Sequence, residues 1–311
     1  MTTQRIPLLA GPTAVGKSSI AVAWAEAESG EVVSCDSRQL YAEMEVGTAK
    51  PTADETARVR HHFVGEATVS DPWSAGRFAR AAEERLTEIL HRGHMPIVVG
   101  GSTLYIQALV DGLADIPPTD PGVRQALNDK LTQVGAKVMY EALLRVDPAF
   151  AGTLDETKSQ RILRGLEVYA STGRPLSSFF AEATPPSHRF RVIVLNMDRE
   201  ALYKRIDTRV DRMMADGLLA EVHRLMEAGF NPNENPLRTI GYAELAPCLL
   251  GERKVPEAVA LIKRNSRRYA KRQLTWLRGR ADATWVDLNP ALSADQAVET
   301  LQSLLAGEQA E

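Results

Sequence analysis

Residues 6–18, IPLLAGPTAVGKS, constrain the fold of this chain more than any other stretch. An apolar run that predicts a strand leads into residues 11–18, which match the pattern G-x-x-x-x-G-K-[ST] at every fixed position. The next residues, SIAVAWAEAE, have the composition of a helix. A strand, a glycine-rich loop and a helix in this order predict an α/β protein of the P-loop type, with a parallel sheet flanked by helices.

This loop is suited to binding anions through its backbone. Gly11 and Gly16 allow N–H groups to converge on phosphate oxygens, and the following helix directs its positive dipole end at them. Lys17 adds a full positive charge, and the hydroxyl of Ser18 is a ligand for Mg²⁺. A glycine-rich turn without a ligand is the alternative, which a complete match between a strand and a helix disfavours. The pattern predicts a polyphosphate ligand and does not distinguish ATP from other candidates.

Length, composition and charge exclude several classes of protein. The chain has 311 residues, 44% of them hydrophobic and 25% charged, which is typical of a globular protein with a large core and more than one domain. The net charge of −3 predicts no global attraction to nucleic acid, so any such contact requires a local patch. Cys35 and Cys248 lack metal-binding spacing. Without a secretory signal or an apolar run of membrane-spanning length, we expect a cytoplasmic protein with reduced thiols and no membrane association.

Two further predicted strands end in polar residues at the same edge of the sheet as the phosphate loop. Residues 31–35, EVVSC, precede Asp36, and residues 95–99, MPIVV, precede a glycine pair and Ser102. Ligands gather at the carboxyl ends of parallel strands. Asp36 can therefore act as a base, cap the next turn or hold Mg²⁺ through water. No acidic residue follows the strand at 95–99, where many P-loop ATPases keep an aspartate coupled to Mg²⁺, which disfavours an ordinary nucleotide hydrolase.

The middle of the chain predicts an all-helical insertion domain. Residues 1–116 and 188–311 form the predicted catalytic core, and residues 117–187 form the insertion, bracketed by proline-rich stretches. We expect Asp155 to cap a helix that Gly173 ends. A domain inserted between sheet strands is typical of one that covers a substrate, which is an analogy at the level of the fold.

Two helices carry basic residues that allow a functional and a structural interpretation. Gln160, Arg161 and Arg164 form a basic edge in the insertion, where surface charge on an amphipathic helix is the plainer interpretation. In the core, Arg209 and Arg212 can each reach a phosphate as a bidentate donor or pair with neighbouring aspartates. Spacing alone does not separate these alternatives.

The strongest charge bias lies in residues 258–280, which hold eight Lys or Arg residues and no acid. Basic residues recur four positions apart and form one broad helical stripe: Lys263, Arg264, Arg267, Arg268, Lys271 and Arg272. Ile262, Tyr269 and Trp276 lie on another face and are expected to pack inward. A solvated surface is the alternative, but a run of one sign in an otherwise acidic chain favours contact with a phosphate backbone.

The motifs form an ordered set over nearly the whole chain, from Gly11 to about Gly279: GPTAVGKS, DSRQLY, GTAKP, VVGGSTLY, DPGVR, QRILRGLEVY, TGRPLS, RVDRMMADGLLAEV, RTIGY and KRQLTWLRG. This set resembles the tRNA dimethylallyltransferase family of bacterial isopentenyltransferases. The P-loop alone is shared with many kinases and ATPases, whereas its combination with DSxxxY, GTAKP, RxxGY and KRQxTW is highly specific.

The resemblance implies an activity. In this family the P-loop holds the diphosphate of dimethylallyl diphosphate, and the dimethylallyl group passes to N6 of adenosine 37, 3′ of the anticodon in tRNAs. Asp36 matches the family's general base, within reach of a flipped-out adenine. Lys17, Mg²⁺ and Arg209 are expected to stabilise the growing charge on the diphosphate. Ser102 stands where many members have threonine and is expected to contact the diphosphate or the target nucleotide.

The resemblance also implies two sets of binding residues, with the tRNA anticodon stem-loop and dimethylallyl diphosphate as partners of a monomer. The diphosphate set is Gly11, Pro12, Thr13, Ala14, Val15, Gly16, Lys17 and Ser18, with Mg²⁺ on Ser18. The tRNA set is Asp36, Ser37, Arg38, Gln39, Ser102, Arg124, Gln160, Arg161, Ile162, Leu163, Arg164, Arg238, Thr239, Ile240, Gly241, Tyr242, Ala243, Lys271 and Arg272. The basic helix is expected to follow the backbone of the anticodon stem.

Three other functions fit parts of this pattern. A small-molecule ATP kinase of the shikimate or adenylate type shares the P-loop and a strand-end aspartate, but has no need of the basic stripe. An adenylate isopentenyltransferase runs the same chemistry on a free nucleotide, so only the basic helix and the insertion argue for RNA. A non-enzymatic RNA-binding switch that senses nucleotide through the P-loop would leave Asp36 dispensable.

Overall fold

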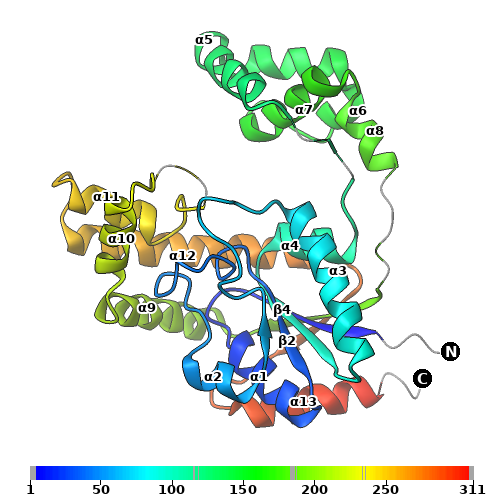
Figure 1. The fold of residues 1–311 in the computed structure, drawn as a ribbon, viewed down its shortest axis with the longest axis vertical. Coiled ribbons are helices and arrows are strands. Elements are labelled where there is room, and N and C mark those ends of the chain that lie inside the picture. Colours follow the sequence, from blue (N-terminus) through cyan, green and yellow to red (C-terminus); the bar gives the residue numbers. More distant parts are fainter. Residues whose placement is uncertain are drawn as a thin grey trace. The chain divides into compact units, whose positions relative to one another are not determined.

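The computed structural model divides the chain into two compact units, residues 1–110 with 186–311, and residues 111–185 (Figure 1). It describes residues 5–114, 116–117, 119–182, 186, 188–232, 234 and 236–307. We call the first unit the core unit and the second the insertion unit. The sequence places the insertion at 117–187, a few residues from these limits.

A six-stranded parallel sheet with the order β3-β2-β4-β1-β5-β6 forms the centre of the core unit. This confirms the predicted α/β fold with a parallel sheet flanked by helices. The central strands are apolar and fully buried, as expected for a parallel sheet covered on both faces. The strands are β1 (Ile6–Ala10), β2 (Glu31–Cys35), β3 (His61–His62), β4 (Pro96–Gly100), β5 (Phe190–Asn196) and β6 (Ala283–Asp287).

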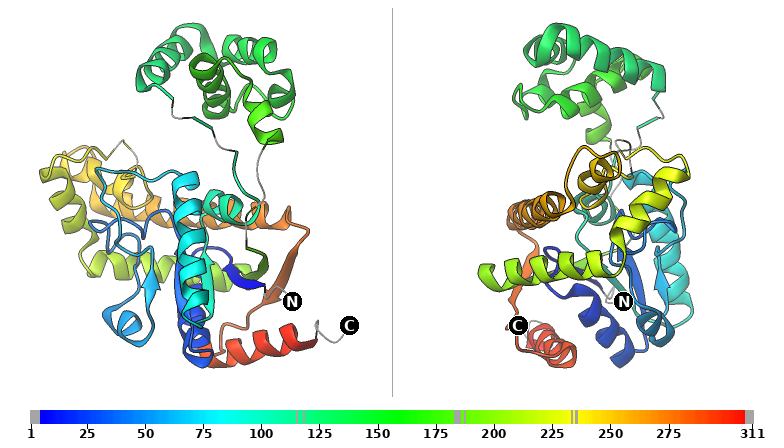
Figure 2. Two further views of the ribbon diagram at one scale, coloured as in Figure 1. Left: turned by 45° about the vertical axis from the view of Figure 1, so that its right-hand side comes forward. Right: turned by 90° about the vertical axis from the view of Figure 1, so that its left-hand side faces the viewer.

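Helices cover both faces of this sheet. Right-handed crossovers from β1 to β2 and from β3 to β4 run in opposite directions along the sheet, so α1 and α3 lie on opposite faces (Figure 2). Helix α13 packs beside α1, and α4 packs beside α3. The helices of the core unit are α1 (Lys17–Ala27), α2 (Ala53–Arg58), α3 (Ala75–His91), α4 (Thr103–Val110), α9 (Arg199–Ala215), α10 (Leu218–Glu227), α11 (Tyr242–Leu249), α12 (Val255–Arg278) and α13 (Ala294–Gly307).

Two long helices, α9 and α12, pack side by side at the carboxyl edge of the sheet. Helix α9 begins at Arg199 because the Asp198 carboxylate accepts hydrogen bonds from the N–H groups of Glu200 and Ala201, each at 2.9 Å. Helix α12 packs against α9, α11 and α4. Ile262 on α12 is buried, as its spacing predicts, whereas Trp276 is only partly buried. These contacts fix α9 and α12 side by side, so their facing side chains form one wall.

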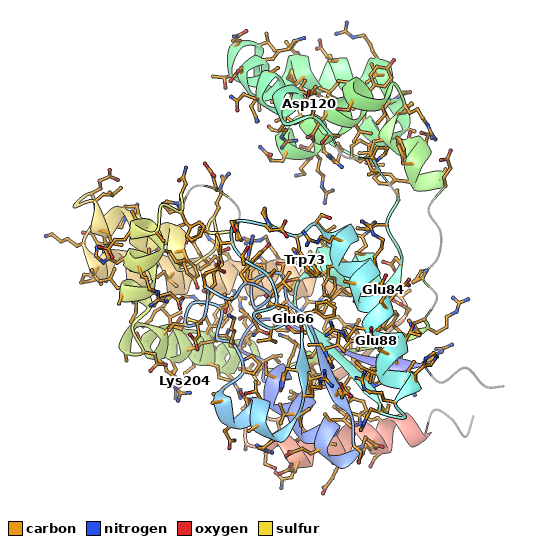
Figure 3. The ribbon with its side chains drawn as sticks, viewed as in Figure 1. Glu66, Trp73, Glu84, Glu88, Asp120 and Lys204 are labelled. Atoms are coloured by element: carbon orange, nitrogen blue, oxygen red, sulfur yellow. The ribbon has the colours of Figure 1, made fainter. Side chains whose placement is uncertain are left out.

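The insertion unit consists of helices packed around a small apolar core of its own (side chains are drawn in Figure 3), which includes Met139 and Leu143. Gly135 interrupts the first helix with φ 80 and ψ 166, so that helix consists of two segments joined at a kink. The helices are α5 (Pro121–Val146), α6 (Pro148–Ala151), α7 (Ser159–Thr172) and α8 (Leu176–Ala181). None of the helices among the described residues of either unit combines the length and apolar character needed to cross a membrane.

The ends of α7 show one correct and one wrong prediction. Gly173 ends the helix in the left-handed conformation, with φ 71, as predicted. Asp155 does not cap it, because its Oδ1 accepts a hydrogen bond from the N–H of Thr157 at 2.8 Å and closes a local turn instead. The helix begins only at Ser159, with no side-chain cap.

Candidate active site

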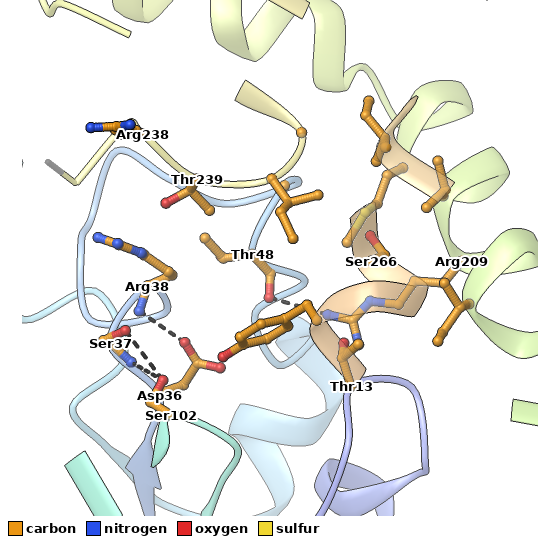
Figure 4. A pocket seen from close by; sticks show the side chains of 18 of the residues that line it. Thr13, Asp36, Ser37, Arg38, Thr48, Ser102, Arg209, Arg238, Thr239 and Ser266 are labelled. Carbon is orange, nitrogen blue, oxygen red and sulfur yellow. Dashed lines mark hydrogen bonds between the residues drawn. The ribbon is translucent and has the colours of Figure 1, made fainter. Parts of the chain in front are cut away.

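A pocket of about 310 Å³ opens in the core unit where β1, β2 and β4 end (Figure 4). The loops after these strands contribute Thr13, Asp36 and Ser102, and helices α9 and α12 contribute the opposite wall. Eleven residues proposed from sequence line it: Thr13, Asp36, Ser37, Arg38, Ser102, Arg209, Arg238, Thr239, Ile240, Gly241 and Arg272. The structure thus brings residues from opposite ends of the sequence into one pocket.

The P-loop has a conformation that requires its glycines. Gly11 has φ 151, and a Cβ there would lie 2.5 Å from the carbonyl oxygen of Leu195 on β5. Gly16 has φ 109 and precedes α1. Ala14 also adopts a left-handed conformation, with φ 66, which is uncommon outside glycine and is often found in loops that bind ligands. Left-handed residues of this kind occur in loops whose successive N–H groups form an anion-binding concavity.

Lys17 points back into this cradle. Its Nζ donates hydrogen bonds to the carbonyl oxygens of Gly11 at 3.0 Å and Pro12 at 2.8 Å. Burial lowers the pKa of Lys17 to about 7, nearby Arg209 lowers it as well, and Asp36 opposes both. Burial also lowers the pKa of Arg209, again against the effect of Asp36. Two cations and one carboxylate therefore lie close enough to interact, and a bound anion would relieve the repulsion between the cations.

Two side chains hold the P-loop from outside. Arg205 on α9 donates from Nε to the carbonyl oxygen of Ala14 at 2.9 Å. Gln273 on α12 accepts at Oε1 from the N–H of Thr13 at 2.9 Å. The loop is therefore fixed by groups from both helices of the opposite wall.

Asp36 lies at the end of β2 with one oxygen engaged. Its Oδ1 accepts hydrogen bonds from the N–H groups of Arg38 at 2.8 Å and Gln39 at 3.4 Å (Figure 4). The carboxylate thus caps the following turn, one of the roles open to it from sequence. Among the described residues no partner takes Oδ2, so the side chain is fixed in orientation and retains an oxygen that can accept a proton.

Ser102 and Tyr269 stand next to Asp36. The Oγ of Ser102 accepts from the N–H of Ser37 at 2.9 Å and donates to the Oγ of Ser37 at 3.2 Å. Tyr269 also lines the pocket. Burial raises the pKa of Tyr269 to about 12, and Asp36 acts in the same direction. The phenol therefore stays protonated beside the aspartate.

A buried carboxylate shapes the side of the pocket next to Arg209. Glu221 on α10 accepts from the N–H groups of residues 45–47 at 2.8 to 3.1 Å and from the hydroxyl of Tyr242 at 2.6 Å. The loop that it holds includes Thr48, whose carbonyl oxygen accepts from Arg209 at 3.4 Å. Glu221 thereby fixes the carbonyl that accepts from the half-buried arginine.

The basic stripe on α12 is partly neutralised. Lys263 pairs with Asp211 on α9 at 2.6 Å, and Arg267 pairs with Asp207. These pairs fix the two helices together rather than facing a ligand. The stripe keeps four exposed residues: Arg264, Arg268, Lys271 and Arg272. The predicted footprint for a polyanion is therefore narrower than the sequence indicates.

Several residues predicted to contact tRNA are buried or bonded within the protein. The side chains of Ile162, Leu163 and Tyr242 are fully buried, so they cannot offer a contact surface. Gln39 does not line the pocket; its Nε2 donates to the carbonyl oxygen of Ala49 at 3.0 Å. Each of these residues lies in a motif beside exposed or pocket-lining neighbours. The sequence alone does not show which residues of a motif are buried and which are accessible to a ligand.

The basic edge of the insertion unit is organised by an acid. Glu167, largely buried, accepts at Oε2 from Arg124 and Arg164, each at 3.2 Å, and at Oε1 from Thr119 at 2.8 Å. Arg124 also donates to Gln160 at 2.6 Å. The two arginines are thus held in fixed positions before any ligand arrives.

Sequence reasoning missed three residues that position the site: Arg205, Glu221 and Gln273. Arg205 lies one helical turn before Arg209, which is the only local signal for it. Glu221 and Gln273 lie within motifs of the resemblance, but their partners are distant in sequence. Thr13 and Gln273 are 260 positions apart.

Comparisons with known proteins identify relatives of this chain. The family described as IPP transferase matches residues 39–280. The chain is 47% identical over 298 residues to the tRNA dimethylallyltransferase of Salinibacter ruber, covering 96% of this chain and 92% of that protein. It is 45% identical over 285 residues to the tRNA dimethylallyltransferase 1 of Pelobacter propionicus, covering 91% and 92%.

Solved structures agree as well. A tRNA isopentenylpyrophosphate transferase from Bacillus halodurans has a TM-score of 0.70 and 35% identity, with 97% of this chain and 96% of that chain covered. A eukaryotic dimethylallyltransferase acting on tRNA has a TM-score of 0.77 and 27% identity, with 98% and 80% covered. The family match spans most of the chain and the relatives match nearly end to end, so the chain belongs to the IPP transferase family.

Proposed function

We propose that this protein transfers the dimethylallyl group of dimethylallyl diphosphate to N6 of adenosine 37 in tRNAs and releases diphosphate. One observation supports it above the others: Thr13 of the P-loop, Asp36 and Arg209 line a single pocket together with Arg38, Arg238 and Arg272. Lys17 of the same loop lies close enough to Arg209 and Asp36 for their charges to shift its pKa. A site for an anionic leaving group, a carboxylate and a set of basic residues suited to RNA occur together. The names of the relatives point to the same reaction.

The P-loop receives the diphosphate in this mechanism. Lys17 leaves the carbonyl oxygens of Gly11 and Pro12 and turns to the phosphate oxygens, while the N–H groups of the loop bind the remaining charge. Arg209, held by the carbonyl of Thr48, approaches from the opposite wall. These cations stabilise the negative charge that grows as the carbon–oxygen bond breaks.

In this mechanism Asp36 accepts a proton from the acceptor nitrogen, N6 of the adenosine. The lone pair of N6 forms the new bond to C1 of the allyl group, and the electron pair of the broken carbon–oxygen bond leaves with the diphosphate. N6 then carries an excess proton, which passes to Oδ2 of Asp36. Because Oδ1 is held by the N–H of Arg38, the carboxylate is already oriented for this transfer.

The residues present fit Mg²⁺ bound together with the diphosphate. Ser18 is exposed at the first turn of α1. The described residues contain no cluster of three His, Cys, Asp or Glu side chains that could hold the ion alone. Ser18 and diphosphate oxygens would therefore share it, which suits an ion that takes few protein ligands. When bound, the ion neutralises charge on the leaving group.

The pocket also offers an apolar side for the five-carbon group. Ile206, Val210 and Met213 on α9 and Ile262 on α12 line it. A branched hydrocarbon gains from leaving water at such a surface. The same wall is of no use to the terminal phosphate of ATP, so it favours an allyl diphosphate as the natural ligand.

The test is to incubate the protein with unmodified tRNA and carbon-labelled dimethylallyl diphosphate, then digest the RNA to nucleosides. We expect the label in N6-dimethylallyladenosine, from wild-type tRNA and not from tRNA with guanosine at position 37. If free AMP becomes labelled and the tRNA does not, the protein is instead an adenylate isopentenyltransferase. Phosphoryl transfer from ATP with no labelled nucleoside would identify a kinase.

A further inference from the structure

Gln273 is a buried polar side chain that the reaction chemistry does not use. It lies in the last third of α12 with 3% of its surface exposed, among basic residues that face solvent. A buried amide in this position has to be fully hydrogen-bonded to be tolerated. Its partners therefore indicate what it does.

Both ends of the amide are engaged by different loops. Oε1 accepts from the N–H of Thr13 in the P-loop at 2.9 Å, and Nε2 donates to the carbonyl oxygen of Gly101 at 2.7 Å. The first partner can only donate and the second can only accept, so the orientation of the amide is determined. A Cβ at Gly101 would lie 2.4 Å from Nε2, so only glycine allows this approach.

The two loops joined by Gln273 carry opposite sides of the site. The P-loop holds the diphosphate cradle, and the residue after Gly101 is Ser102, which bonds the turn that follows Asp36. One side chain thus sets the separation between the phosphate loop and the acceptor side. It also engages the N–H of Thr13, which is then not available to a phosphate oxygen.

We propose that Gln273 is a positioning residue that holds the P-loop in its anion-binding conformation. This inference rests on the proposed function, because it takes the ligand of the loop to be a diphosphate. Without the bridge, the N–H of Thr13 and the carbonyl of Gly101 lose their partner, and the loop relaxes to satisfy them. The cradle would then have to be rebuilt at each binding event, which weakens affinity.

The experiment is calorimetric titration of the full chain with inorganic diphosphate and Mg²⁺. For Gln273→Met, which keeps the side-chain length but removes both hydrogen bonds, we expect about 10- to 100-fold weaker binding. Affinity for an anticodon stem-loop RNA should stay within about twofold. Thr275→Ala is the matched control, since Thr275 lies on the exposed side of the same helix and, among the described residues, its hydroxyl donates to the carbonyl of Lys271 alone.

The variant Gln273→Glu distinguishes the effect of losing the two hydrogen bonds from the effect of altered packing. A protonated carboxyl can accept from Thr13 and donate to Gly101, whereas a carboxylate repels that carbonyl oxygen. The deficit in diphosphate affinity relative to wild type should therefore shrink as the pH falls from about 8 to about 5.5. The deficit of Gln273→Met should not change over that range, and if that variant does not fold, the pH series of Gln273→Glu decides.

Two results would overturn the inference. Wild-type affinity in Gln273→Met, or a deficit of Gln273→Glu that is constant with pH, would show that the bridge does not shape the cradle. Failure of the wild-type protein itself to bind diphosphate would refute the proposed function, and the inference with it. The wild-type titration thus distinguishes the two failures.

Discussion

In the proposed mechanism, Asp36 combines a structural and a chemical role in one carboxylate. Oδ1 accepts hydrogen bonds from the following turn, and the residue lines the pocket. Asn at this position keeps an oxygen for the N–H of Arg38 but cannot take up a proton. We predict that Asp36→Asn lowers kcat by about 10²- to 10⁴-fold, the usual range for a general base, with tRNA affinity nearly unchanged. Single-turnover transfer to tRNA measures this, and an unaltered rate would remove Asp36 from the chemistry.

Lys17 predicts a pH-dependent affinity for diphosphate. Burial lowers its pKa to about 7 in the free protein. Bound diphosphate favours the charged form and raises that pKa, so above about pH 7 binding takes up a proton. Affinity should then fall as pH rises, by up to about tenfold per pH unit.

The control for this effect is Lys17→Arg, because arginine stays charged throughout the range. Diphosphate contributes its own protonation equally to both proteins. Calorimetry in two buffers of different ionisation enthalpy, at about pH 8.5, should show more proton uptake by the wild-type protein. Equal uptake would mean that Lys17 is already charged before binding.

What the sequence predicts about single residues depends on how local their contacts are. The P-loop pattern encodes a backbone conformation within eight positions, so Gly11, Gly16 and Lys17 are placed correctly. Asp36 follows from its place after a buried strand. Gln273 and Glu221 bond to groups that only folding brings close, so no spacing in the sequence reveals them.

At the scale of single elements, some basic residues of α12 form ion pairs with α9 and others are exposed to solvent. Lys263 is paired with Asp211, whereas Arg268 and Lys271 are exposed. We predict that Arg268→Ala with Lys271→Ala weakens tRNA binding and lowers the slope of log Kd against log salt by about 2. Lys263→Ala is the matched control and should leave the slope unchanged. If the double variant keeps the wild-type slope, the exposed part of α12 does not contact phosphates.

Helix α7 owes its position to one carboxylate. Glu167 accepts hydrogen bonds from Arg124, Arg164 and Thr119 while largely buried, so removing it leaves two arginines without their partner. We predict that Glu167→Ala destabilises the insertion unit by about 2–4 kcal/mol. Hydrogen exchange should quicken in α5 and α7 and stay unchanged in β1 and β4. Uniform loss of protection in both units would contradict this local role.

The same elements show where sequence patterns stop being informative. Four-residue spacing places six basic residues of α12 on one stripe, but it cannot show that α9 presents Asp207 and Asp211 to two of them. Hydrophobic spacing identifies α7, yet the same motif holds buried Ile162 next to exposed Arg161. Pairing between helices decides both outcomes.

At the scale of the whole molecule, the strand, P-loop and helix at the start of the chain were enough to predict the parallel sheet flanked by helices. Strand β3 was missed because it has only two residues, His61 and His62, and exists through its pairing with Val32 and Val33 of β2. A strand of this length has no pattern of its own. The His62 ring is buried, and its Nε2 lies 2.6 Å from Oε2 of Glu31. This edge strand therefore depends on contacts with residues distant in the sequence.

The assembled core unit brings Thr13 of the phosphate loop and the carboxylate of Asp36 into one pocket, so in the proposed reaction both products should form in a single step. The most direct test is single-turnover reaction of an anticodon stem-loop RNA with dimethylallyl diphosphate labelled with ¹⁴C in the allyl group and ³²P in the diphosphate. We predict equal amounts of ¹⁴C in the RNA and of ³²P in inorganic diphosphate, both slowed together in Asp36→Asn. Unreacted allyl donor, together with ATP-dependent phosphorylation of a small molecule, would contradict the account.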